Sequence, residues 1–193
     1  MGITFRFLCL YSIMFFMLGM APSMMAQKVN KKPLPQKKGV EWLSLNEAEE
    51  RMKTEPRKVL VDTYTDWCGW CKVMDQKTFS DPQVIEYLNT YFYCIKFNAE
   101  RKDTITFAGK KYTLYPNSNV NALAAEWMKH KLTYPTCVFM EEGFKNPQPV
   151  PGYLEVANLE MILKYYGENK FKQMSWEKHR NDFKSEWTGG ATK

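Results

Sequence analysis

The sequence holds few of the residues that build metal centres, with only two histidines and five cysteines among its 193 residues. Neither His130 nor His179 has a cysteine at the spacing of a zinc site, so we expect both to be surface or packing residues. The chain also lacks an internal repeat and a sequence motif for a bound cofactor. These absences argue against a zinc protein, a repeat array and an enzyme that depends on a bound cofactor.

No apolar run reaches the roughly 20 residues that a membrane-spanning helix needs. The longest extends from Phe7 to Leu18. Because Arg6 precedes it and small residues and methionine follow it, residues 1–26 are predicted to be a signal peptide, which implies export. Cleavage after Ala26 fits this prediction, whereas the bulky Met24 leaves an uncleaved membrane anchor as the alternative.

The charge gives no sign of a nucleic-acid partner. The formal net charge is +6, and five lysines crowd the short stretch 28–38. Together with prolines, this cluster predicts a solvated linker over residues 27–39 rather than a nucleic-acid or membrane site. The sequence is 45% hydrophobic and 25% charged. Its length leaves room for one domain with a core and some extra segments, and we expect a monomer.

Helical and strand-like patterns alternate between residues 40 and 167. Ser44 and Glu47 form a capping box that starts the first helix. Apolar runs predict strands at 58–64, 91–98, 136–140 and, at the edge of the sheet, 150–154. Helical spacing continues at 45–54, 70–79, 82–88, 120–128 and 159–166, with Gly167 as the last cap. The alternation predicts an α/β domain with a mixed sheet of about four strands.

Two segments stand outside this alternation. Residues 101–118 are predicted to be an insertion that forms a small exposed hairpin, because two strand-like stretches flank Ala108-Gly109-Lys110. Residues 168–193 are predicted to be a C-terminal extension. Its spaced aromatic side chains favour a helix packed against the domain, and a surface for a partner is the alternative.

The most informative stretch is Trp67-Cys68-Gly69-Trp70-Cys71, between a buried strand and a helical segment. Two cysteines separated by two residues at such a junction can close into a disulfide ring and open again, which suits thiol–disulfide exchange. At the helix N-terminus, Cys68 would be stabilised as the attacking thiolate, and Cys71 would resolve the mixed disulfide. The same spacing suits half of a zinc site, but no second pair of ligands exists.

The residues around the two cysteines are candidates for substrate contact. Gly69 permits the tight turn of the motif. Trp67 and Trp70 would form an apolar rim on which an unfolded or extended substrate could rest.

The segment from Val61 to Lys72 resembles the active-site stretch of the thioredoxin family. It is most similar to exported members in which a methionine and a Thr-Phe-Ser-Asp-Pro segment follow the motif, here Met74 and residues 78–82. The C-terminal domain of the periplasmic thiol–disulfide interchange reductase has the same layout. The resemblance covers about residues 40–167 without the insertion. It implies a thioredoxin fold, with a central mixed sheet flanked by helices, and a redox-active disulfide that needs no other cofactor.

The resemblance implies roles for further residues. Asp62 matches the family's buried acid, which can take the proton from Cys71, and Lys96 matches the lysine that partners this acid. Tyr134 and Pro135 match a loop whose proline is cis, so that a backbone edge stays free to pair with substrate.

Gly152 is similar to a glycine beside the same face. Taken singly, Asp62, Lys96 and Pro135 could each be ordinary: a strand-end acid, an edge lysine and a trans proline. Asp66 either tunes the local field or is merely solvated.

The two remaining cysteines, Cys94 and Cys137, lie in apolar strands and are most simply small buried hydrophobic residues. A second redox role is the alternative for Cys137, because it follows Pro135 by two residues.

The sequence thus predicts an exported thiol–disulfide oxidoreductase that reduces protein disulfides. The expected partners are protein disulfides or dithiols and a membrane electron donor. Trp70 stands where thioredoxins usually have proline, so the redox potential does not follow from the resemblance. A disulfide oxidase or isomerase, and a non-catalytic binding module on the same fold, are the alternatives.

Overall fold

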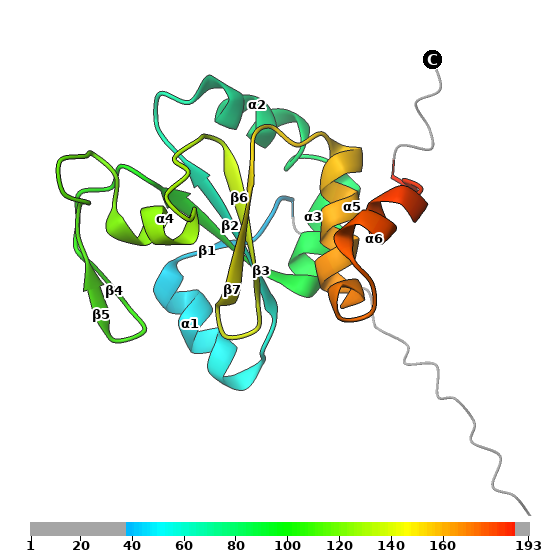
Figure 1. Cartoon of the computed structure of the whole chain (residues 1–193), viewed down its shortest axis with the longest axis horizontal. Coiled ribbons are helices and arrows are strands. Elements are labelled where there is room, and N and C mark those ends of the chain that lie inside the picture. The colour runs from blue at the N-terminus through cyan, green and yellow to red at the C-terminus, as the bar shows by residue number, and fades with distance from the viewer. Residues whose placement is uncertain (1–37, 188–193) are drawn as a thin grey trace, which may run out of the picture. The chain divides into compact units, whose positions relative to one another are not determined.

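The computed structural model describes residues 38–187, which contain a five-stranded mixed sheet (Figure 1). Its strand order is β1 (Trp42–Leu43), β3 (Phe92–Asn98), β2 (Lys58–Tyr64), β6 (Thr136–Glu141) and β7 (Lys145–Pro151). The first three are parallel to one another, whereas β6 and β7 each run antiparallel to their neighbours. The predicted α/β architecture with a central mixed sheet is confirmed.

Helices cover both faces of the sheet. The first face carries α1 (Leu45–Thr54) and α4 (Ala122–Trp127), which pack on Val59, Val61 and their neighbours. The second face carries α2 (Gly69–Lys77), α3 (Pro82–Tyr91) and α5 (Val156–Gly167), which pack around Leu60 and Phe139. Because successive strand residues point to opposite faces, a strand between two helical layers must be apolar throughout, as β2 nearly is.

Side chains cap the starts of α1 and α3, and the cap of α1 is the predicted capping box. Ser44 and Glu47 form the capping box of α1. Asp81 accepts hydrogen bonds from two backbone amides at the start of α3, and Pro82 occupies the first turn. These side chains satisfy amides that have no partner inside the helix.

Two predictions about the sheet were wrong. The predicted edge strand 150–154 in fact spans Lys145–Pro151, and β1 adds a fifth strand of only two residues, too short to leave a periodic pattern. In β7, prolines occupy positions 147, 149 and 151. They alternate with residues whose backbone N–H groups point toward β6. Gly152 belongs to this second set of alternate positions, and its N–H donates to the Pro135 oxygen at 2.8 Å. The positions without N–H groups therefore face away from β6, where an edge strand tolerates proline.

The predicted hairpin insertion exists as β4 (Ile105–Phe107) and β5 (Lys110–Tyr112). It is not simply exposed, however, because Ile105, Phe107 and Tyr112 are buried in the first core. The Phe107 ring meets the Trp127 ring, with centroids 5.4 Å apart. The helix predicted at 120–128 is shorter than expected because the Asn121 side chain caps it and starts α4 at Ala122.

The described part of the C-terminal extension, residues 168–187, packs against the domain, as predicted. A short 3-10 turn, η1 (Lys170–Lys172), leads to α6 (Trp176–Asp182), which lies beside α5 (Figure 1). The buried Glu160 carboxylate accepts hydrogen bonds from the backbone amides of Glu186 and Trp187. These bonds tie residues 186 and 187 of the extension to α5.

Gly167 was predicted to cap α5, and this is wrong. Gly167 is still helical, and the left-handed residue is Asn169, at φ 56°. A Cβ on Gly167 would lie 2.7 Å from the Tyr87 hydroxyl oxygen. The contact with the Tyr87 side chain of α3, rather than a turn, therefore favours glycine here.

The predicted signal peptide, the first part of the linker up to residue 37 and the last residues of the extension, 188–193, lie outside the described residues. Within residues 38–187, no helix combines the length and the apolar character needed to cross a membrane.

Candidate redox site

The site lies at the edge of the sheet where β2 and β3 end. Tyr64 and Asn98 are register partners at these two ends, and Thr63 pairs with Thr136 at the start of β6. The loops that follow β2 and β3, the loop that precedes β6 and the end of β7 therefore meet at this edge. Ligand and catalytic sites in open α/β sheets commonly lie at the carboxyl ends of parallel strands.

Cys68 and Cys71 form a disulfide at the N-terminus of α2, with their Cα atoms 5.3 Å apart. The backbone N–H of Cys68 donates to the Thr65 oxygen at 3.1 Å, which closes the turn between β2 and the helix. Cys68 is the N-cap residue, and its Sγ accepts a hydrogen bond from the N–H of Cys71 at 3.1 Å. The predicted position of Cys68 at a helix N-terminus is thus confirmed.

Asp62 lies on β2 with its side chain only 2% exposed. Its Oδ2 is 3.3 Å from the Lys96 ammonium, and its buried Oδ1 has no hydrogen-bond partner among residues 38–187. Burial raises the pKa of Asp62 to about 6, against the opposing attraction of Lys96. The predicted pairing of a buried acid with a lysine is therefore present.

The sequence analysis missed a second acid at this lysine. Asp75 on α2 forms an ion pair with Lys96, whose ammonium also lies over the Trp42 and Tyr64 rings. The negative charge of Asp75 raises the pKa of Asp62 further. Asp75 follows Cys71 by one helical turn, and this spacing was the signal that could have revealed it.

The Tyr134–Pro135 peptide bond is cis, as the resemblance implied. Gly152 has a φ of 95°, which side chains rarely adopt, and its N–H bonds to the Pro135 oxygen. The turn before β6 and the end of β7 are thereby joined.

Two aromatic pairs connect the disulfide segment to the turn before β6 and to the residues after β7. The rings of Trp67 and Tyr134 meet edge to face with centroids 5.8 Å apart, and those of Trp70 and Tyr153 lie 5.5 Å apart. Trp67 is 67% exposed and Trp70 is 63% exposed, although both are large and apolar. The predicted aromatic rim exists, with Tyr153 as a member that the sequence analysis had not named.

The other two cysteines are free thiols in the second core, and both are fully enclosed. Cys137 is the register partner of Asp62 across β2 and β6. Burial raises the pKa of the Cys94 and Cys137 thiols, so both stay neutral. His179 is a packing residue, as predicted, because its Nε2 meets the Met161 oxygen at 2.9 Å inside an aromatic cluster.

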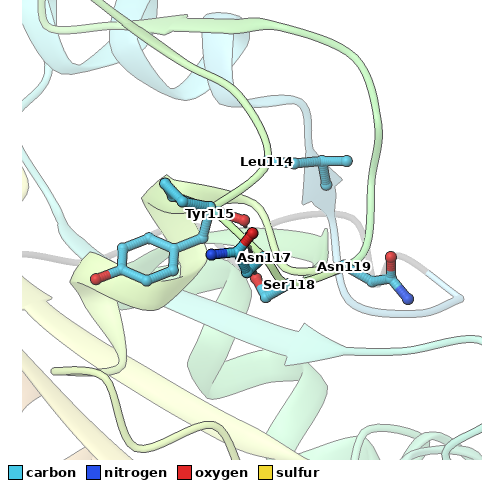
Figure 2. A pocket seen from close by; sticks show the side chains of 6 residues that line it. Leu114, Tyr115, Asn117, Ser118 and Asn119 are labelled. Carbon is cyan, nitrogen blue, oxygen red and sulfur yellow. Dashed lines mark hydrogen bonds between the residues drawn. The ribbon is translucent and has the colours of Figure 1, made fainter.

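An open hollow in the loop between β5 and α4 lies apart from the redox residues. It is lined by Leu114, Tyr115, Pro116, Asn117, Ser118 and Asn119, all from this one loop (Figure 2). None of them belongs to the disulfide, the buried acid or the cis-proline turn. Among residues 38–187, no three His, Cys, Asp or Glu side chains are grouped to hold a metal ion.

Comparisons with known proteins place the chain in a family. The family model Thioredox_DsbH, described as "Protein of unknown function, DUF255", matches residues 30–173. The thiol:disulfide interchange protein DsbD of Salmonella typhi is 32% identical over 126 residues, 62% of this chain and 18% of that protein. DsbD of Haemophilus ducreyi is 44% identical over 48 residues, 24% of this chain and 8% of that protein. This chain therefore spans less than a fifth of the length of either relative.

A solved structure supports the fold. A thioredoxin-fold protein from Helicobacter pylori superimposes with a TM-score of 0.50 and 12% identity, covering 72% of this chain and 84% of that one. At this identity the similarity concerns the fold alone, which is that of thioredoxin.

Proposed function

The chain belongs to the thioredoxin-like family described as DUF255, and from this membership we propose that it reduces protein disulfides through Cys68 and Cys71. The observation that carries the proposal is the Cys68–Cys71 disulfide at the N-terminus of α2, with the buried Asp62–Lys96 pair at the same sheet edge. This arrangement combines a helix N-terminus that stabilises a thiolate with a buried carboxylate that can accept a proton.

In the reduced protein, the Cys68 thiolate attacks one sulfur of a substrate disulfide and displaces the other as a thiolate. The helix N-terminus favours the Cys68 thiolate, because the Cys71 N–H already points at this sulfur. The Cys71 thiol then loses its proton and attacks the Cys68 sulfur, which releases the second substrate thiol. The substrate gains two electrons, and the protein ends with the Cys68–Cys71 disulfide.

Asp62 is suited to accept the Cys71 proton. A pKa of about 6 lets a carboxylate take a proton near neutral pH and release it again, which an ordinary exposed aspartate does poorly. Lys96 and Asp75 tune this affinity in opposite directions.

Each turnover oxidises the protein, so the proposal requires a dithiol donor that returns two electrons. We assign this role to a membrane partner outside the cytoplasm, because residues 1–26 carry the pattern of an export signal. The 101–118 insertion and the Tyr134 side chain suggest a substrate different from that of a general reductase.

A trapping experiment tests the proposal. With Cys71 replaced by serine, the mixed disulfide cannot be resolved, so incubation of the reduced variant with insulin should give a covalent adduct through Cys68. Mass spectrometry of tryptic peptides would locate the bond, and dithiothreitol should release it. The double variant Cys68→Ser/Cys71→Ser is the control and should form none. Absence of the adduct, or an adduct through Cys94 or Cys137, would refute the proposed reaction.

A further inference from the structure

We propose that the corner formed by Trp67, Glu100 and Tyr134 selects protein substrates that carry a lysine or arginine beside the cysteine under attack. This inference rests on the proposed function and names the substrate class of the same site. The sequence analysis assigned no role to Glu100.

The corner lies next to the reacting sulfur. Trp67 directly precedes Cys68, and Tyr134 directly precedes the cis-proline, so the 5.8 Å contact between their rings bridges the two segments. The indole Nε1 of Trp67 donates to Oε2 of Glu100 at 3.0 Å. This bond holds a carboxylate beside the exposed Trp67 ring.

The two carboxylates on the Trp67 side of the disulfide have neutral hydrogen-bond partners. Glu100 accepts from the Trp67 indole, and Asp66 accepts from the Asn98 amide at 3.1 Å. Neither forms an ion pair with any residue in the described part of the chain. By contrast, Asp62 and Asp75 are both paired with Lys96. The Trp67 side of the site therefore presents negative charge that no ion pair within residues 38–187 compensates.

Tyr134 completes the corner as a neutral aromatic wall beside Trp67. Its hydroxyl oxygen is buried and has no hydrogen-bond partner among the described residues. Burial and the nearby Glu100 carboxylate both raise the pKa of Tyr134, so the phenol stays neutral. A substrate guanidinium or ammonium group could donate to the Glu100 carboxylate while it lies against the exposed Trp67 face.

The opposite side of the disulfide lacks this arrangement. Trp70 contacts Tyr153, and within the described residues no acidic side chain is hydrogen-bonded to its indole. The acid nearest to Tyr153 along the chain is Glu155, which is exposed and is the N-cap residue of α5. We therefore expect the preference for a basic residue on one side of the attacked cysteine only.

The test compares three disulfide-bonded peptides that differ only at the residue next to one cysteine, which is arginine, its neutral isostere citrulline, or glutamate. A second set places the same residues on the other side. At low salt, the reduced protein should react with the arginine peptide with a second-order rate constant about fivefold higher than with the citrulline peptide, as one exposed ion pair and a cation–π contact allow. The preference should fall as salt rises.

The matched variants are Glu100→Gln and Glu155→Gln. The first keeps an acceptor for the Trp67 indole but removes the charge, so the arginine-to-citrulline ratio should fall to near one. The second should leave the ratio unchanged. Equal rates on arginine and citrulline peptides in the unmodified protein, or a ratio unaffected by Glu100→Gln, would overturn the inference while the proposed function stands. Failure to reduce any peptide would instead overturn the proposed function and the inference with it.

Discussion

Replacement of Cys68 by serine is expected to abolish disulfide reduction. A serine hydroxyl at the N-cap keeps the hydrogen bond from the Cys71 N–H, so α2 should form normally. It cannot, however, supply the nucleophile or form a disulfide. Loss of an attacking group of this kind lowers the rate by roughly a thousandfold or more. The measurement is the rate at which the reduced protein precipitates insulin or reduces a model disulfide.

The control for this result is Cys94→Val, which removes a thiol of the second core without touching the site. Cys94 is buried and its thiol stays neutral, so this variant should retain the rate of the unmodified protein. Unchanged activity in Cys68→Ser would show that the reaction uses another group.

Replacement of Asp62 by asparagine is expected to stabilise the protein at pH 8 but not at pH 4. Burial raises the folded pKa of Asp62 from its ordinary 3.8 to about 6. Below pH 3.8 the carboxyl is protonated in both the folded and the unfolded chain, so its raised pKa does not lower the free energy of unfolding. Between the two values the unfolded chain releases the proton more readily, so the folded protein loses stability as the pH rises to about 6. Above about pH 6 the carboxyl is ionised in both states, so the loss in the free energy of unfolding stays constant.

Asparagine carries no such penalty, so the free energy of unfolding should rise by about 1 to 3 kcal/mol at pH 8, less any cost of an unpaired amide. Urea denaturation at pH 4 and at pH 8 measures the difference, with the exposed Asp66→Asn as control. Asp62→Asn should also slow disulfide reduction by roughly a hundredfold, because the Cys71 proton loses its acceptor. Equal gains in stability at both pH values would contradict the assignment of a raised pKa to Asp62.

The redox centre could be predicted because its signals are local. The spacing of Cys68 and Cys71, the buried strand before them and the helical spacing after them all lie within one short stretch of sequence. Asp62 precedes Cys68 in the same stretch. Its role as an acid, however, came from the resemblance, as did the roles of the distant Lys96 and Pro135.

The errors arose where contacts across the fold decide the outcome. Three prolines in β7 argue against a strand, and only the outward direction of their missing N–H groups reconciles them with pairing to β6. The buried face of the β4–β5 hairpin depends on Trp127, which follows it in the chain. No local sequence signal pointed to Glu100, because its partner, Trp67, lies on another loop.

The most direct test of the account is an equilibrium redox titration of the purified protein against dithiothreitol. The fluorescence of Trp67 and Trp70, which flank the disulfide, would report its state. We predict one two-electron transition with a midpoint more negative than that of the cellular glutathione pool, roughly −240 mV, and its loss in Cys68→Ser. A midpoint well above that value would contradict a reducing role and favour an oxidase or isomerase. Absence of any transition would contradict a redox function altogether.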